Sequence, residues 1–519
     1  MLKILLLVIY FGVMVGIGIY CRKNATDVSG FVLGGRSVGP WLTAFAYGTS
    51  YFSAVIFVGY AGQFGWKFGV ASTWVGIGNA VIGSLLAWAV LGRRTRIMTQ
   101  HFDSATMPQF FGQRFQSKGL KIGASVIVFI FLIPYTASLF NGLSRLFGMA
   151  FHIDYTVCII LMGVLTGVYV IAGGYMATAI NDFIQGCVML FGIVVIIAAV
   201  LHSQGGFMEA LKGLAQVSDP ETVNGDVPGI FASFFGPDPL NLLGVVILTS
   251  LGTWGLPQMV QKFYAIKSED SVQKGTIIST LFAVVVAGGC YFLGGFGRLF
   301  SDKITVGANG GVEFDSVIPS MLSSLPEILI ALTVVLVLSA SMSTLSSLVI
   351  ASSSTLTIDL LKDNLVRDMS ERKTVFLIRC WIVVFVLLSM IIAVVQYKAQ
   401  GSAVRFIAQL MGVSWGALAG AFLAPFLYGL YWKGTTKAAC WVCYVFGAGI
   451  MVLNLLFRAH FPALLQSPIN CGAFAMLAGL VIVPVVSVFT KTPDQGMVEE
   501  AFACYEKKAP VAQRKALSD

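Results

Sequence analysis

Charged residues are scarce in this chain. They make up 11% of its 519 residues, whereas about 25% is ordinary for a soluble domain. Hydrophobic residues make up 57%, and apolar runs of about 20 residues, enough to cross a bilayer, recur along nearly the whole sequence. The alternation typical of a membrane barrel is absent, and no loop is long enough for a second folded domain. The sequence therefore predicts an all-α polytopic membrane protein.

Motifs for several other functions are also missing. There is no Walker motif, nucleophile elbow or carboxylate pair for acid–base catalysis, so we expect neither an enzyme nor an ATP-driven pump. The nine cysteines form no disulfide framework and the four histidines have no ligand spacing, so no organic cofactor or transition metal is expected. The net charge of +9 forms no basic stripe, which argues against nucleic acid as a partner. No feature indicates an obligate protein partner.

About thirteen segments have the length and composition of transmembrane helices. They are residues 2–21, 40–64, 69–92, 122–148, 153–172, 175–201, 239–263, 271–297, 326–358, 374–397, 403–431, 436–457 and 468–489. Lysine and arginine concentrate in the segments that lie inside when the N-terminus is outside, and the long segment 202–238 is mainly acidic. The positive-inside rule therefore predicts a multi-pass protein of the cytoplasmic membrane, with its N-terminus outside and its C-terminus in the cytoplasm.

Two of these spans contain residues that interrupt membrane helices. The 40–64 span contains a Gly, Thr and Ser run at 48–53, and the 239–263 span contains Gly and Pro at 252–257. Each opens a unit of five spans, which predicts an inverted repeat with discontinuous helices and a midplane binding site. The expected parts are an N-terminal extra helix and cytoplasmic loop (1–39), a first five-helix repeat (40–201), an extracellular loop (202–238), a second five-helix repeat (239–431), two C-terminal helices (432–490) and a cytoplasmic tail (491–519).

A cluster of hydroxyl side chains stands at 341–347, within an apolar span. An unsatisfied polar group at membrane depth costs several kcal/mol, so something there must take up the lone pairs. Ser343, Ser346 and Ser347 share one helix face, with Thr344 at its edge. Neutral hydroxyl oxygens suit a sodium ion, and close helix packing is the alternative explanation.

Asp182 lies inside another span, where an ionised side chain costs about 2.5–3.5 kcal/mol on insertion scales and needs a partner. A sodium ion shared with the serine face is one candidate, and a lysine or arginine near the cytoplasmic boundary is the other. The sequence shows no clear buried lysine or arginine clamp for a solute, which disfavours a multiply charged anion.

Several motifs together resemble the sodium/solute symporter family, particularly its sodium/proline and sodium/pantothenate branches. The resemblance extends from about Phe31 to Trp432. Its motifs are Gly34-Gly35-Arg36-Ser37, Gly173-Gly174-Tyr175, Asn181-Asp182-x-x-Gln185, Trp254-Gly255-Leu256-Pro257-Gln258, Met342-Ser343-Thr344-Leu345-Ser346 and Ile358-Asp359-Leu360. The family implies a LeuT-like fold of thirteen helices that drives solute uptake with the sodium gradient by alternating access.

The resemblance also implies site residues. One sodium site maps onto the backbone carbonyls of Thr49, Phe52 and Ala340 and the hydroxyls of Ser343 and Thr344. A second sodium site, present in some members, maps onto Asp182, Ser343, Ser346 and Ser347, so both one and two ions per cycle are compatible with the sequence. The expected solute-binding residues are Tyr51, Ser53, Ile56, Tyr135, Thr253, Trp254, Gly255 and Pro257.

We therefore expect a sodium-coupled symporter whose partners are sodium, a small organic solute and the lipid bilayer. The solute would be an amino acid such as proline or a monocarboxylate such as pantothenate. Tyr51 stands where the proline branch carries an aspartate, so the resemblance does not decide between them. The alternatives are a proton-coupled carrier, with Asp182 carrying the proton, and a transporter-like solute sensor, for which the tail after about Lys491 is short.

Overall fold

A computed structural model describes residues 2–151, 153–220, 227–306, 311–323, 325–362, 369–398 and 407–506. Within these ranges the chain forms helices and no strands, with two isolated bridges of extended backbone. The predicted all-α class is therefore confirmed. The start of the predicted 403–431 span and residues 507–519 of the predicted tail lie outside the described residues.

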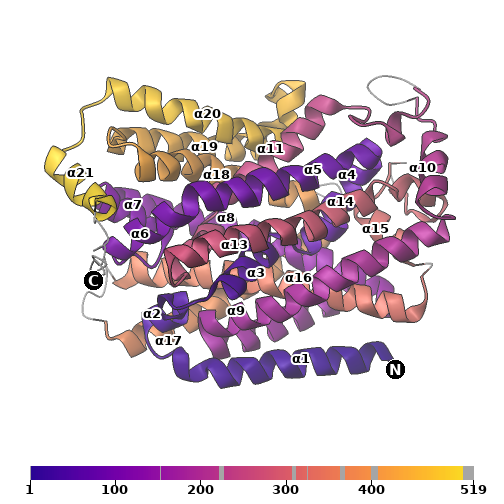
Figure 1. Ribbon diagram of the computed structural model, residues 1–519, viewed down its shortest axis with the longest axis horizontal. Coiled ribbons are helices and arrows are strands. Elements are labelled where there is room, and N and C mark those ends of the chain that lie inside the picture. The colour runs from indigo at the N-terminus through magenta and orange to yellow at the C-terminus, as the bar shows by residue number, and fades with distance from the viewer. Residues whose placement is uncertain are drawn as a thin grey trace, which may run out of the picture.

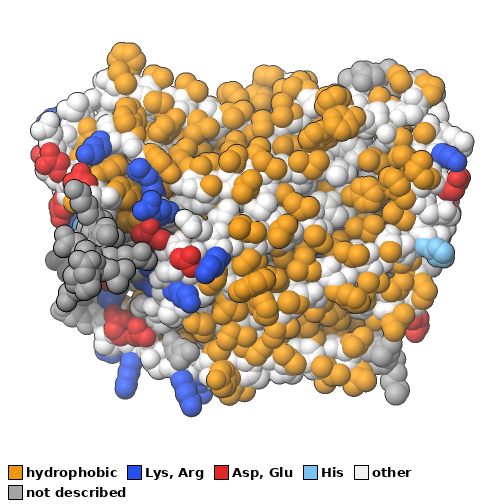
Figure 2. Space-filling view, viewed as in Figure 1, with side chains coloured by type: hydrophobic (Ala, Val, Ile, Leu, Met, Phe, Trp, Pro, Cys, Tyr) orange, Lys and Arg blue, Asp and Glu red, His pale blue; other side chains and the backbone are white. Residues whose placement is uncertain are grey.

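The long helices lie side by side along the long axis of the molecule (Figure 1). Those used below are α3 (Pro40–Tyr51), η3 (Val55–Tyr60), α4 (Ala61–Phe68), η5 (Asn79–Leu86), α8 (Lys118–Phe151), α9 (Tyr155–Ser203), α11 (Pro239–Gly255), α12 (Pro257–Ala265), α16 (Glu327–Ser354), α17 (Glu371–Lys398), α18 (Ile407–Tyr431), α19 (Lys437–Phe457) and α20 (Pro468–Phe489). α1 (Leu2–Cys21) lies along one edge of this bundle. Hydrophobic side chains cover the side of the helix bundle seen in Figure 2, as expected of a surface that faces lipid.

In the described part of the chain, nine helices are long and apolar enough to cross a membrane, or ten if α11 and α12 form one bent span. This number agrees with a multi-pass membrane protein. The number thirteen stays a prediction, because this criterion treats Val55–His101 as one helix and leaves Leu5–Cys21 and Tyr155–Leu165 as shorter apolar helices.

Both spans that were predicted to be interrupted are broken. Phe52 follows α3 with an extended backbone (φ −88°, ψ 115°), and Leu256 follows α11 with nearly the same one (φ −84°, ψ 122°). The axes of α11 and α12 differ by 46°. An extended residue interrupts the hydrogen-bond ladder of a helix, so carbonyl oxygens near each break become available to other partners.

The boundary predicted between the spans 153–172 and 175–201 is also visible. α9 runs through both, but Gly174 within it has φ 58° and ψ −160°. This backbone conformation suits glycine, which lacks a Cβ, and it divides α9 into two parts.

α16, which carries the hydroxyl cluster, is deeply enclosed by other helices. Every side chain from 336 to 355 is buried, and the helix packs against α1, α3, α8, α9 and α17. The hydroxyl groups of α16 therefore face other protein segments and not lipid.

Candidate functional site

The hydroxyl cluster of α16 lies against the break that follows α3. The Thr344 hydroxyl oxygen lies 3.2 Å from the carbonyl oxygen of Thr49, 3.4 Å from that of Phe52 and 3.0 Å from that of Ala340. The Ser343 hydroxyl donates to the Thr49 hydroxyl at 2.6 Å. All five residues are buried. The structure thus brings together the whole residue set of the first predicted sodium site.

The break explains why these carbonyl groups are accessible. In a continuous helix the Thr49 carbonyl would accept from the N–H of Ser53, four residues later. The extended backbone at Phe52 turns the chain away, and the Thr344 hydroxyl instead approaches the carbonyls of Thr49 and Phe52. Oxygen atoms from two distant segments consequently converge at one buried point.

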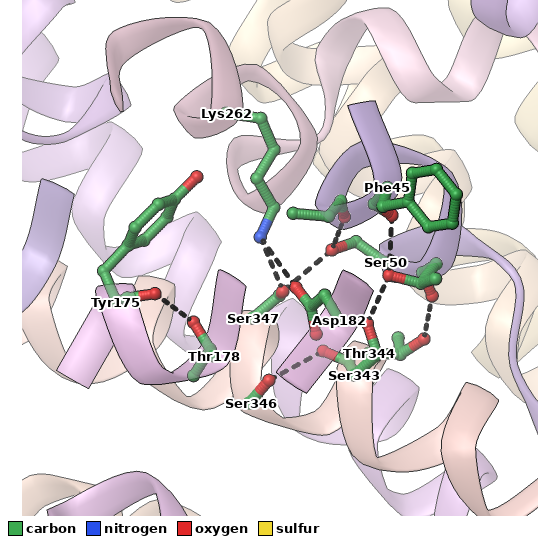
Figure 3. A network of polar contacts seen from close by, with 12 residues as sticks. Phe45, Ser50, Tyr175, Thr178, Asp182, Lys262, Ser343, Thr344, Ser346 and Ser347 are labelled. Atoms are coloured by element: carbon green, nitrogen blue, oxygen red, sulfur yellow. Dashed lines mark hydrogen bonds and ion pairs between the residues drawn. The ribbon is translucent and has the colours of Figure 1, made fainter. Parts of the chain in front are cut away.

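A second cluster of polar side chains lies one turn further along α16, around Ser347 (Figure 3). Ser347 exchanges a hydrogen bond of 2.8 Å with Ser50 of α3. Lys262 of α12 donates from Nζ to the Ser347 hydroxyl at 2.9 Å. The same Nζ lies 3.9 Å from Oδ2 of Asp182 on α9, and the side chains of Lys262 and Asp182 are 2% and 0% exposed. A buried ion pair therefore joins α12 to α9, and the hydrogen bond from Lys262 to Ser347 adds α16 to the same network.

The residues of the second predicted sodium site surround this ion pair unequally. Ser343 is adjacent to Asp182, although its hydroxyl donates to Thr49. The Ser346 hydroxyl donates to the carbonyl oxygen of Ser343, within its own helix, at 2.8 Å. Neither carboxylate oxygen of Asp182 has a hydrogen-bond partner among the described residues. The charge of Lys262 is thus the main compensation for Asp182, with the neighbouring Ser343 hydroxyl beside it.

Lys262 is a buried basic residue that sequence reasoning missed. Its ammonium group contacts Asp182 and Ser347, so the absence of a basic clamp for a solute stays a prediction. Of the two partners considered for Asp182, a basic side chain is the one that the structure places beside it. Lys262 lies near the end of its predicted span, where a lysine normally extends to the membrane surface. A signal was nevertheless present, since Lys262 is the one basic residue in 239–263.

Three of the predicted solute-binding residues are buried. Ser53 and Ile56 follow the break in the first helix, and Tyr135 belongs to α8. The Tyr135 hydroxyl lies near the side chains of Ser53 and Trp415 but forms no well-aligned hydrogen bond with a described residue. Its ring packs edge-on against Trp415 of α18, with the centroids 5.9 Å apart. The side chain of Tyr51 lies outside the described part of the chain.

The other four predicted solute-binding residues, at the break between α11 and α12, are Thr253, Trp254, Gly255 and Pro257. The Thr253 hydroxyl donates to the Gly83 carbonyl at 3.1 Å, and the Trp254 indole N–H donates to the Ile82 carbonyl at 2.9 Å. Both polar groups are thus engaged with η5. α18 approaches the backbone of Gly255 closely, since an added Cβ there would lie 2.8 Å from the Ala419 Cα.

Trp415 is a residue that sequence reasoning missed. It is buried, contacts the Tyr135 ring, and lies so close to α11 that a Cβ on Gly252 would meet its ring at 2.8 Å. Trp415 therefore fills the space between the broken second helix and α8. Its sequence context, a small-residue stretch in an apolar span, carries no signal for this position.

Broken helices that meet at a buried polar centre are typical of the core of a secondary transporter. The family model described as the sodium:solute symporter family matches residues 31–447. The chain therefore belongs to the sodium:solute symporter family. It is a sodium-coupled symporter of a small solute and not an enzyme.

Relatives with known names match almost the whole chain. It is 27% identical over 488 residues to the osmoregulated proline transporter OpuE of Bacillus subtilis. This alignment covers 93% of this chain and 94% of OpuE. It is 28% identical over 503 residues to the sodium/proline symporter of Staphylococcus aureus. That alignment covers 94% of this chain and 93% of the symporter.

Solved structures agree on the fold. The substrate-bound, outward-open sodium-coupled sialic acid symporter aligns with a TM-score of 0.72 and 16% identity, over 95% of this chain and 99% of that one. Mhp1, a nucleobase-cation-symport-1 family transporter in a closed conformation, aligns with a TM-score of 0.54 and 13% identity, over 91% of this chain and 97% of that one. These alignments confirm the LeuT-like fold class.

Proposed function

We propose that the chain imports a small amino acid, with proline as the first candidate, together with sodium bound by Thr49, Phe52, Ala340, Ser343 and Thr344. The proline transport named for two relatives supports the solute. A monocarboxylate such as pantothenate is the second solute class to test. The carboxylate that both classes share would be stabilised at the N-terminus of a half-helix such as α12.

The observation that carries the sodium site is the position of the Thr344 hydroxyl, 3.0 to 3.4 Å from three carbonyl oxygens. Calcium, which is close to sodium in size, takes oxygen ligands at about 2.3–2.6 Å, and neighbouring ligands around such an ion lie about 3.2–3.7 Å apart. The Thr344 hydroxyl therefore lies from each of the three carbonyl oxygens at nearly the spacing of neighbouring sodium ligands. The adjustment needed is a few tenths of an ångström.

The same geometry provides a coupling mechanism. α3 belongs to the proposed first repeat (40–201) and α16 to the second (239–431), so a sodium ion between them joins the two repeats. An ion that binds one arrangement of the repeats more tightly shifts the population toward it. Sodium would favour the outward-open state that accepts solute, and its loss to the cytoplasm would favour solute release.

A pocket at one end of the bundle also supports a solute with a carboxylate. Its volume is about 360 Å³, and its lining includes Lys67, Arg298 and Arg458 together with Asp219 and Asp238. Basic side chains exceed acidic ones there by one charge, which raises the local concentration of anionic groups. The first turns of α11 and the end of α4 contribute to the same lining.

We assign the N-terminus to the outside and the C-terminus to the cytoplasm of the cell membrane. The start of α1 and the helix α21 (Gln495–Phe502) lie at opposite ends of the bundle (Figure 1). Lysine and arginine side chains gather near the end that carries α21 (Figure 2). Both features support this orientation through the positive-inside rule.

The test is uptake of radiolabelled proline and pantothenate into proteoliposomes under an inward sodium gradient, compared with potassium or choline. Thr344→Ala should abolish sodium-dependent uptake, because it removes the hydroxyl that approaches all three carbonyls. Thr333→Ala is the matched control, since the Thr333 hydroxyl donates only to the Leu329 carbonyl of its own helix. Uptake that ignores sodium but follows a proton gradient would replace this proposal with the proton-coupled alternative.

A further inference from the structure

Lys262 brings a fixed positive charge to the place where a second sodium ion was expected. We propose that its ammonium group acts as a tethered cation between Asp182 and Ser347, so that one sodium ion, and not two, accompanies each solute. This inference deepens the proposed function and rests on it for the first sodium ion. It concerns a stoichiometry that the family membership leaves open.

The contacts of the ammonium group match those of a bound cation. Nζ of Lys262 lies 2.9 Å from the Ser347 hydroxyl and 3.9 Å from the Asp182 carboxylate. It also lies 5.0 Å from the centroid of the Tyr175 ring, within the range of a cation–π contact. In Figure 3 the Lys262 side chain extends from α12 toward Ser347 and Asp182, between α9 and α16.

A sodium ion at this place would compete with the ammonium group for the same ligands. The Ser347 oxygen is already within hydrogen-bond distance of both Lys262 and Ser50. Asp182 supplies one negative charge, which the charge of Lys262 balances. A second cation would leave an excess positive charge in a fully buried site, where like charges repel strongly.

The location of Lys262 also matters for transport. α12 is the second half of a broken helix and bends away from α11 by 46°. Discontinuous helices of this kind form the substrate and ion sites near the midplane of such transporters. The ammonium group is covalently attached to α12, so it can occupy a cation position there without being carried across the membrane.

The test counts sodium ions on the purified full-length protein with ²²Na⁺, and measures the sodium-to-solute flux ratio in proteoliposomes. Lys262→Met removes the charge and keeps an unbranched apolar chain. It should bind one more sodium ion than the wild type and raise the flux ratio from one to two. Lys262→Arg, which keeps the charge, should retain the wild-type count. The double variant Lys262→Met/Asp182→Asn should lose the additional ion.

An unchanged sodium count in a folded Lys262→Met protein would overturn the proposal. Two sodium ions bound to the wild type would overturn it as well, and this measurement needs no variant to fold. Thr344→Ala, introduced into both backgrounds, separates this inference from the proposed function. It should remove the first ion from each protein while the difference between Lys262→Met and wild type persists. If the wild type binds no sodium, the first sodium site is contradicted. The difference in sodium count between Lys262→Met and the wild type then still tests the role of Lys262.

Discussion

The hydroxyl of Ser343 donates to the hydroxyl of Thr49 across the contact between α16 and α3, at 2.6 Å. Thr49 in turn donates to the carbonyl of Phe45 within α3 at 2.8 Å. Both residues are completely buried. The hydroxyl of Ser343 is therefore held by a helix of the other proposed repeat, at the point where the first sodium site is proposed.

Ser343→Ala should raise the sodium concentration for half-maximal uptake about tenfold, which corresponds to about 1.4 kcal/mol. The substitution removes one oxygen ligand and leaves Thr49 without its donor. The measurement is solute uptake as a function of sodium concentration. Ser354→Ala is the control, because the Ser354 hydroxyl donates to Ala351 in its own helix at 3.2 Å. Equal sodium dependence in the two variants would remove Ser343 from the site.

Asp182→Asn should strongly destabilise the protein. It leaves the ammonium group of Lys262 buried without a countercharge, and breaking a buried pair in this way costs about 3–5 kcal/mol. Thermal unfolding in detergent measures the effect. Because Asp182 and Lys262 interact directly, the loss in Lys262→Met/Asp182→Asn should be smaller than the sum of the two single losses. If the losses of unfolding free energy are additive, Asp182 and Lys262 have no coupling free energy.

The sequence predicted the helical class and the positions of the breaks well. Hydropathy determines which segments are helical in a membrane, and the Gly, Ser and Pro residues around Phe52 and Leu256 identify where helices stop. The five residues of the first sodium site followed from the family resemblance, and they meet in space. Their ion-binding role stays a prediction for the experiments above.

What the sequence could not supply are contacts between distant helices. Lys262 and Asp182 are far apart in the chain, and no local sequence pattern predicts that α12 packs close to α9. Trp415 is similar, since its contacts with Tyr135 and Gly252 depend on how α18 packs between α8 and α11. Such positions depend on tertiary packing, which single-sequence patterns do not encode.

Gly447→Ala should destabilise the packing of α19 on α18. A Cβ on Gly447 would lie 2.3 Å from the carbonyl carbon of Gly420, far inside van der Waals contact with backbone that cannot rotate away. Close backbone approach at small residues is a major source of helix association in membranes. The control is Gly449→Ala on the same helix, where no atom lies within 4 Å of the new Cβ. Thermal unfolding should show a lower midpoint for Gly447→Ala alone.

Tyr135→Phe should weaken solute binding without changing the response to sodium. The Tyr135 hydroxyl is buried and forms no well-aligned hydrogen bond with a described residue, so a solute carboxylate or amine is the partner that we expect for it. Loss of one hydrogen bond to a charged group corresponds to about 1.5–3 kcal/mol, or roughly a 10- to 150-fold increase in KM for uptake.

The matched control for this prediction is Tyr444→Phe. The Tyr444 hydroxyl is also buried and lacks a partner in the described part of the chain, but its ring packs against Phe111 and Phe422 and the residue is not one of the predicted solute-binding residues. An increase in KM for Tyr135→Phe alone, at an unchanged half-maximal sodium concentration, would place Tyr135 in the solute site. An increase shared by both variants would instead indicate a general effect of removing buried hydroxyl groups.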